Sequence, residues 1–318
     1  MNKTWPVILV LALALSACGQ RQSAPVSYRS FPKVQVPAMV TQQSEAVSYI
    51  AEHFWDPYFA TQGVTDSAAI LGVRKLEVEQ ALADYLAVLD RIPLSDAQKQ
   101  MDRLFSKVEA CQAADTASLF YLRFTEMVEK YLYDPNSPLR NEDLFLPFVR
   151  KLADCPYTDS LMHTGYAYEA KMCALTPAGS IAPDFQFKDI RGKVHSLHGT
   201  KAQYTMLFFS NPFCEACKEM IDDIDGSVVV SLAIEEGTVA VVNVYIDEEI
   251  GRWKAYEPTY PRSWITGYDW KYEIRTDQSY NVRAIPSLYL LAEDKTVIMK
   301  DAPTDRVLRY LENKLTKN

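Results

Sequence analysis

Hydrophobic residues between about positions 40 and 175 recur with the 3.6-residue period of helices. One such buried face is formed by Met101, Leu104, Phe105 and Val108. The preceding Ser95-Asp96-Ala97-Gln98 has the form of a capping box, which predicts that a helix begins there. Similar patterns predict helices at 42–55, 76–91, 116–133, 141–153 and 159–174. We therefore expect an all-helical domain over residues 38–176.

The pattern changes at 176–180, where Thr-Pro-Ala-Gly-Ser ends the helical periodicity. From there, short apolar runs alternate with helical stretches, which predicts an α/β domain over residues 177–318. Its predicted strands are 185–187, 193–197, 204–209, 238–246, 287–292 and 296–300. Its predicted helices are 214–224, 248–256 and 304–315, with Thr304 as the cap of the last.

The most informative stretch of the α/β domain runs from Tyr204 to Met220. Residues 204–209 are apolar without polar alternation, as expected of a strand that is covered on both faces. A helix that begins at Cys214 would place this sulfur beside free backbone N–H groups, which stabilise a thiolate over a thiol. Cys217 lies one turn further on, close enough to attack a mixed disulfide on Cys214. The pair therefore predicts a redox-active dithiol.

The N-terminus has the form of an export signal. Lys3 supplies a positive charge, residues 7–15 are apolar, and Leu15-Ser16-Ala17-Cys18-Gly19 resembles a bacterial lipobox. This resemblance implies that residues 1–17 are a lipoprotein signal peptide, and that lipid on Cys18 anchors the chain to a membrane. An ordinary secretory signal, with Cys18 incidental, is the alternative. With lipid on Cys18, residues 18–37 would form a tether between the membrane and the folded chain. The absence of an acidic run after Cys18 favours a periplasm-facing position in the cell envelope.

Composition and charge limit the classes of molecule that the chain is expected to bind. The chain has 318 residues, with 33 Lys and Arg against 41 Asp and Glu, which gives a net charge of −8. Without a basic excess, we expect no nucleic-acid partner, and proteins or small thiols are favoured instead. Outside the cytosol any cysteine pair can be oxidised, but for Cys111, Cys155 and Cys173 the sequence leaves open one bridge plus a free thiol or three buried thiols.

Three segments of the α/β domain carry a resemblance to a known family. They are Ala182-Pro183-Asp184-Phe185, the stretch Phe208-Phe209-Ser210-Asn211-Pro212-Phe213-Cys214-Glu215-Ala216-Cys217-Lys218, and residues 280–291 with Ile285-Pro286 at their centre. In this order they resemble thioredoxin-like domains of extracytoplasmic thiol-disulfide oxidoreductases of the ResA and TlpA kind. The helical part resembles an N-terminal domain of unknown function that precedes such domains in lipoproteins. The resemblance implies a central mixed sheet flanked by helices.

The resemblance also implies a site and a reaction. Cys214 and Cys217 would be the catalytic residues, exchanging disulfides with protein substrates, with an upstream thiol as electron donor, no cofactor and no metal. The Ile285-Pro286 bond would be cis and would offer the Ile285 backbone to a substrate, whereas a trans proline at the start of a strand is the alternative. Phe213 would shield the first cysteine and contact the substrate. A reductase or isomerase direction is favoured over oxidation.

Three positions depart from the family pattern. Phe213 stands where the family often has a Trp, and since both side chains are apolar we expect little change. Phe208 stands where thioredoxins have a buried Asp that moves protons, and Met220 stands where ResA-like domains have a Glu. Glu219, one residue earlier, is rotated by about 100° on a helix, so a solvated charge is its favoured role.

Other features have two interpretations each. His195 and His198, together with the two cysteines, mimic a zinc spacing, but residues three apart on a strand face opposite sides. Seven aromatic residues between Trp253 and Tyr272 either wall a substrate groove or, as we favour, pack onto the sheet. A further alternative for the whole chain is a redox-inert binding or scaffold lipoprotein whose helical domain engages a partner.

Overall fold

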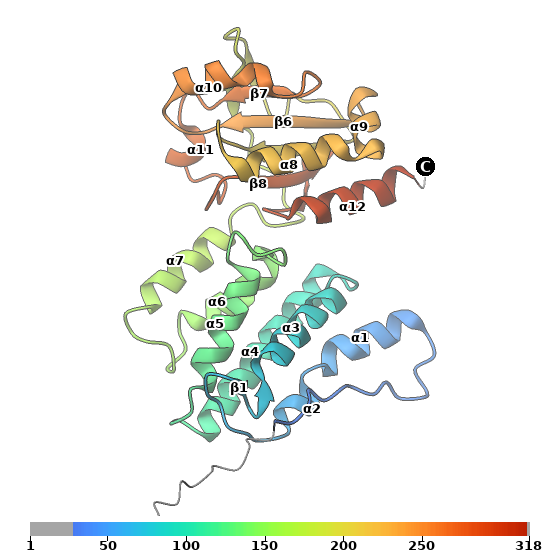
Figure 1. Cartoon of the computed structure of the whole chain (residues 1–318), viewed down its shortest axis with the longest axis vertical. Coiled ribbons are helices and arrows are strands. Elements are labelled where there is room, and N and C mark those ends of the chain that lie inside the picture. The colour runs from blue at the N-terminus through green and yellow to red at the C-terminus, as the bar shows by residue number, and fades with distance from the viewer. Residues whose placement is uncertain (1–27, 317–318) are drawn as a thin grey trace, which may run out of the picture.

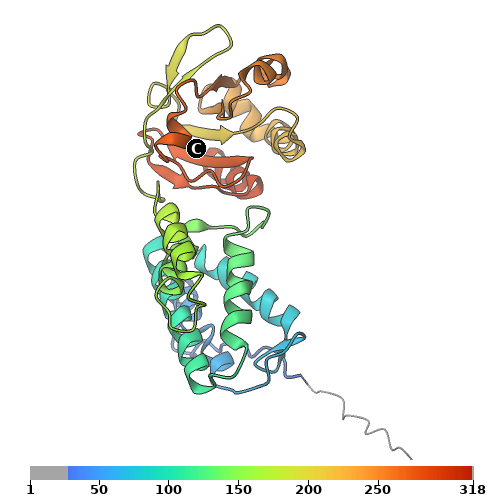
Figure 2. The ribbon, with the colours of Figure 1, turned by 90° about the vertical axis from the view of Figure 1, so that its left-hand side faces the viewer.

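The computed structural model describes residues 28–316, which form two parts stacked along the long axis of the molecule (Figures 1 and 2). The helical part lies at one end, and a sheet with its flanking helices lies at the other (Figure 1). The predicted signal peptide and Cys18 lie outside the described residues. None of the helices between residues 28 and 316 combines the length and the apolar composition that crossing a bilayer requires.

The first part contains the predicted helices within a few residues of their expected bounds. They are α1 (Gln43–His53), α2 (Asp56–Phe59), α3 (Lys75–Leu89), α4 (Leu94–Ala114), α5 (Phe120–Leu132), α6 (Glu142–Leu152) and α7 (His163–Cys173). The periodicity did not predict α2, nor the antiparallel pair β1 (Ala69–Ile70) and β2 (Val73–Arg74). Both strands have only two residues, too few for an alternating pattern.

The start of α4 corrects one expectation. The helix begins at Leu94 behind Pro93, and no side chain caps it, so Ser95 does not act in a capping box. The side chain of Gln98 has another partner, because its Nε2 donates to the carbonyl of Asp143 at 2.9 Å. That carbonyl lies four residues before Pro147, which has no N–H to offer it within α6. Gln98 therefore replaces a helix hydrogen bond that proline removes.

Part of the predicted tether is tied to the helical part. The N–H of Arg29 donates to the carbonyl of Gly72 at 2.9 Å, and Arg29 forms a parallel bridge with Val73. Phe31 stacks on Tyr58 with ring centroids 5.2 Å apart and packs against the core. Arg29 and Phe31, which the predicted tether included, therefore belong to the packed structure.

The second part is a seven-stranded mixed sheet in the order β4-β3-β7-β6-β5-β8-β9. Its strands are β3 (Gln186–Lys188), β4 (Val194–Ser196), β5 (Tyr204–Phe209), β6 (Val239–Tyr245), β7 (Ile265–Tyr268), β8 (Ser287–Ala292) and β9 (Val297–Met299). Its helices are α8 (Glu215–Gly226), α9 (Val228–Glu235), α10 (Ile250–Tyr256), α11 (Glu273–Thr276) and α12 (Thr304–Leu315), with a 3₁₀ turn, η1, at Glu257–Thr259. The mixed sheet with flanking helices confirms the predicted fold class.

Strand β5 is an interior strand of the sheet, parallel to its neighbour β6 and antiparallel to its neighbour β8. Met206 and Phe208 face a core built with α8, α9 and α12, whereas Leu207 and Phe209 face a second core on the other side. Burial on both faces explains why this strand lacks polar alternation. Thr304 is the first residue of α12 and makes no capping hydrogen bond, because Pro303 occupies the cap position, so the predicted Thr304 cap is wrong.

Candidate redox site

The ends of β5 and β8 bring two sequence-distant segments to one edge of the sheet. Phe209, the last residue of β5, pairs with Ser287, the first residue of β8. The cysteine segment follows β5 directly, and Pro286 immediately precedes β8. The peptide bond between Ile285 and Pro286 is cis. The register therefore places the cis-proline loop, residues 281–287, and the cysteine segment at the same edge of the sheet.

The two cysteines occupy the start of α8 and differ in exposure. Cys214 is the N-cap residue, and its Sγ accepts a hydrogen bond from the backbone N–H of Cys217 at 3.1 Å. The two sulfurs form a disulfide. Cys214 is half-buried, whereas Cys217 has only 2% of its surface exposed. Only the first sulfur is thus open to attack from outside.

The space beneath the disulfide is apolar. Cys217 belongs to the core cluster of Phe208 and Met220, and both Cys214 and Ile285 pack against that cluster. Phe208 is fully buried, and Glu219 points to solvent as an exposed side chain. Phe208 and Met220, two of the positions at which the sequence departs from the family pattern, therefore surround the buried cysteine with hydrophobic side chains.

Phe213 forms an exposed aromatic surface beside Cys214. Its side chain is 65% exposed, and its φ of 60° lies in the left-handed region that non-glycine residues rarely adopt. Tyr256 of α10 packs against it with ring centroids 5.0 Å apart, and the guanidinium of Arg252 lies 5.0 Å from the centre of the Phe213 ring. Sequence reasoning counted Tyr256 only as one aromatic among seven and missed Arg252, because neither carries a motif.

The segment with seven aromatic residues, 253–272, is called the aromatic insertion here. Its buried rings pack onto the sheet, which is the interpretation favoured from the sequence. Trp253, Tyr260 and Trp264 are buried, and Trp253 shares a small core with Tyr245 of β6. Of this group, Tyr256 is the member in ring contact with the aromatic residue next to the cysteines. The insertion therefore fixes α10 on the sheet and directs one ring toward the site.

The two histidines of the zinc-like spacing have partners of their own, and the other cysteines that the structure describes are not bonded to one another. His195 Nε2 lies 3.1 Å from a carboxylate oxygen of Asp189, and His198 Nε2 lies 2.7 Å from the carbonyl of Ala182. Within residues 28–316, no group of three or more His, Cys, Asp or Glu side chains is arranged to hold a metal ion. In the same range the cysteines outside the disulfide are free thiols: Cys111, Cys155 and Cys173. Burial raises the pKa of the Cys111 and Cys173 thiols, which makes them poor nucleophiles.

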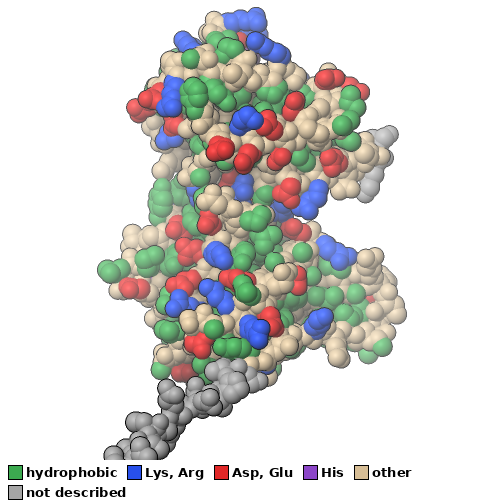
Figure 3. Space-filling model, in the orientation of Figure 1, with side chains coloured by type: hydrophobic (Ala, Val, Ile, Leu, Met, Phe, Trp, Pro, Cys, Tyr) green, Lys and Arg blue, Asp and Glu red, His purple; other side chains and the backbone are tan. Residues whose placement is uncertain are grey.

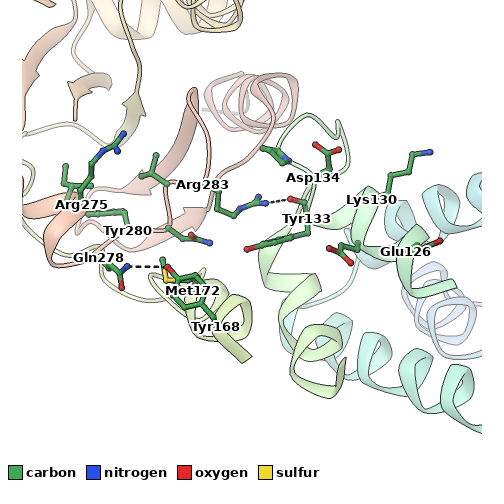
Figure 4. A pocket seen from close by; sticks show the side chains of 15 residues that line it. Glu126, Lys130, Tyr133, Asp134, Tyr168, Met172, Arg275, Gln278, Tyr280 and Arg283 are labelled. Carbon is green, nitrogen blue, oxygen red and sulfur yellow. Dashed lines mark hydrogen bonds between the residues drawn. The ribbon is translucent and has the colours of Figure 1, made fainter. Parts of the chain in front are cut away.

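A cleft of about 960 Å³ lies between the two parts, near the proline loop (Figure 4). Residues 281–283 line it from the sheet side, and Tyr133, Tyr168 and Met172 line it from the helical side. Neither cysteine is part of its wall. On the face of the molecule shown in Figure 3, acidic and basic side chains are interspersed, so that face carries no field of a single sign.

Comparisons with known proteins cover both parts. Residues 15–172 match a family model described as "Domain of unknown function (DUF5106)". A crystal structure of a thioredoxin-like protein from Bacteroides caccae has 30% identity and a TM-score of 0.72, covering 90% of this chain and 99% of that one. A search of curated proteins found no match.

Two further solved structures match less than half of this chain. A conserved protein of unknown function from Bacteroides fragilis has 36% identity and a TM-score of 0.42, covering 42% of this chain and 98% of its own. The thioredoxin domain of a thiol-disulfide oxidoreductase from Bacteroides vulgatus has 19% identity and a TM-score of 0.39, covering 43% and 97%. Because the similarity to the Bacteroides caccae protein runs through nearly the whole of both chains, this chain belongs to the thioredoxin-like proteins, with DUF5106 as its N-terminal part.

Proposed function

We propose that this chain is a thiol-disulfide oxidoreductase that exchanges disulfides with protein substrates through Cys214 and Cys217. One observation carries the proposal: a half-exposed cysteine at the start of a helix is bonded to a buried one, at the sheet edge that also holds a cis-proline loop. The N–H of Cys217 donates to the Cys214 sulfur, and a donor in that position stabilises a thiolate once the disulfide is reduced.

In the reducing direction, the Cys214 thiolate attacks one sulfur of a substrate disulfide. A mixed disulfide forms and the first substrate sulfur leaves as a thiolate. Cys217 then loses its proton and attacks the Cys214 sulfur, which releases the second substrate thiolate. The substrate gains two electrons and the Cys214–Cys217 disulfide is restored. An external thiol must reduce this disulfide again before another cycle.

Two surfaces beside the cysteines support a protein substrate. The backbone of Ile285 precedes a proline without N–H, so an extended substrate segment would pair with its free groups as an added strand. The exposed Phe213 ring, backed by Tyr256, offers apolar contact on the other side. We favour reduction or isomerisation over oxidation, in keeping with the resemblance to the ResA and TlpA kind.

The proposed setting is the cell envelope, with lipid on Cys18 holding the chain at a membrane and its folded parts facing the periplasm. The lipobox-like Leu15-Ser16-Ala17-Cys18-Gly19 supports this setting. Metabolic labelling with a fatty acid tests it, because Cys18→Ser should lose both the label and the membrane association. Label retained by Cys18→Ser would contradict the proposal.

The catalytic assignment is tested by reduction of a model protein disulfide with the full chain. Cys214→Ser should abolish turnover, and Cys217→Ser should accumulate a mixed disulfide between Cys214 and the substrate, visible by mass. Cys111→Ser removes a half-buried thiol of the helical part and is the matched control, which should retain wild-type turnover. Turnover that survives in Cys214→Ser would reject this residue as the nucleophile.

A further inference from the structure

We propose that Glu142, on α6 of the helical part, is a positioning residue for the cis-proline loop, residues 281–287, of the thioredoxin-like part. The inference deepens the proposed function and its catalytic consequence rests on it. It would give the DUF5106 part a task in the reaction, since this carboxylate reaches across the boundary between the parts and binds the loop that we assign to the substrate.

Glu142 is buried, with 2% of its surface exposed, and the hydrogen bonds and ion pairs of its carboxylate are with the other part. Its Oε1 accepts from Arg283 Nε at 2.7 Å and from Asn281 Nδ2 at 2.8 Å. Its Oε2 forms an ion pair with Lys300 Nζ at 2.7 Å. Lys300 in turn donates to the carbonyls of Cys173 and Leu175, at the end of the helical part. The carboxylate therefore holds two side chains of the loop and one from the end of β9.

Arg283 extends this contact to a second anchor. Its guanidinium lies over the Tyr133 ring, 4.0 Å from the centroid, and donates to the Tyr133 carbonyl (Figure 4). Its NH2 group also donates to Asp301 Oδ2 at 3.0 Å. The other oxygen of Asp301 accepts from Ser287 Oγ at 2.8 Å. The cis bond thus lies between two held residues, Arg283 before it and Ser287 after it.

A planar guanidinium with fixed donors orients its partners more strictly than a point charge does. Buried ion pairs add little net stability, yet removal of one partner leaves the other charges without compensation. Glu142→Gln keeps the size of the side chain but removes its charge, so the ion pairs with Arg283 and Lys300 are lost and the hold on the loop is weakened. The cysteines themselves are untouched. Reactions that need the loop backbone should therefore slow, while reactions of the sulfurs alone should continue at the wild-type rate.

The experiment compares the full chain with Glu142→Gln and with Asp90→Asn. Asp90 pairs with Arg306 at 2.7 Å, another contact between the two parts, but one that does not touch the loop, so its variant is the matched control. For Glu142→Gln we expect a fall of roughly tenfold in kcat/KM for a protein disulfide, because misplaced groups lose catalytic geometry. Its redox potential and its rate of reduction by dithiothreitol should match wild type. Asp90→Asn should match wild type in all three.

Hydrogen exchange supplies a readout that does not depend on activity. Amides between Arg283 and Ser287 should exchange faster in Glu142→Gln and remain unchanged in Asp90→Asn. Unchanged exchange in Glu142→Gln, or an equal loss of protein-disulfide and dithiothreitol reactivity, would overturn the positioning role. If wild type itself reduces no protein disulfide but exchange still rises in Glu142→Gln, the proposed function fails while the positioning contact stands. Arg283→Lys removes the planar guanidinium and its several donors, and it is measured in the same way. If Glu142→Gln does not fold, this variant tests the positioning role in its place.

Discussion

The two parts of this chain use their cores for different purposes. The helical part is built around interlocking aromatic rings, such as those of Phe105 and Phe148, which lie 4.9 Å apart between α4 and α6. The thioredoxin-like part encloses a sheet between a mainly aliphatic layer and a second layer with ring contacts of its own, such as Phe209 with Tyr289, and its reactive groups lie where the strands end. The carboxylate of Glu142, on the helical part, forms an ion pair with Arg283 of the other part. The core of the thioredoxin-like part supports the strand ends that carry the cysteines. The core of the helical part supports Glu142, which contacts the cis-proline loop.

The largest expected effect concerns the aromatic core. Phe148 is fully buried, so Phe148→Ala should lower the free energy of unfolding by about 3–5 kcal/mol through lost contacts and a cavity. Phe148→Leu keeps most of the volume and should cost under about 1.5 kcal/mol. Chemical denaturation followed by circular dichroism measures both. Because Glu142 and Lys300 link the parts through a buried ion pair, we expect one transition, and two separate transitions would contradict the coupling.

The sheet should respond to an added methyl group in the next largest effect. A Cβ on Gly267 of β7 would lie 2.5 Å from Cδ2 of Phe187 and 2.8 Å from the carbonyl oxygen of Lys188. Gly267→Ala should therefore destabilise the chain by about 1–3 kcal/mol. Gly251→Ala, on α10, meets no atom within 4 Å and should not destabilise it. Thermal unfolding of the two variants tests this contrast, and equal transitions would contradict the close packing of β7 on β3.

A pH-dependent effect is expected from Glu169 on α7. Burial, followed by repulsion from Glu129, raises the pKa of Glu169 from 4.5 to about 7. A carboxyl group with a raised folded-state pKa contributes stability below its unfolded pKa and loses it as the pH rises through the folded value. The loss should therefore occur between about pH 4.5 and 7.

Glu169→Gln should flatten this dependence and be more stable than wild type at pH 8, by roughly 1 kcal/mol after allowance for solvent screening of a half-exposed group. Denaturation midpoints measured from pH 5 to 8 check the prediction. Glu45→Gln, on an exposed side chain of α1, is the control and should keep the wild-type slope. An unchanged slope in Glu169→Gln would show that this carboxyl group is not the source.

The smallest effect belongs to Gly165 on α7. A Cβ there meets no atom within 4 Å, and the residue is exposed within a helix. Gly165→Ala should stabilise the helical part by about 0.5–1 kcal/mol, since alanine loses less backbone freedom on folding. Calorimetry measures the shift. A lower melting temperature would indicate a role for this glycine beyond the helix.

The sequence predicted elements whose pattern is local. Strand β5 was predicted with its observed bounds, because residues 204–209 form an uninterrupted apolar run. The sequence pattern did not predict α9, because its start, Val228-Val229-Val230, is rich in strand-forming residues. Nor did it predict β7, which has only four residues and includes Gly267. The cysteine and proline segments were found through the family resemblance. Glu142 could not be found, because its partner Asn281 lies 139 residues away and no local pattern encodes that contact.

Cys214 and Cys217 are expected to cycle as one redox couple. The most direct measurement equilibrates the full chain in thiol buffers of graded potential, traps free thiols with an alkylating reagent and counts labels by mass. The account predicts one two-electron transition that adds two labels, maps to Cys214 and Cys217, and is absent in Cys214→Ser. A pair that stays oxidised or reduced across the whole range, or labels that map to other cysteines, would contradict it.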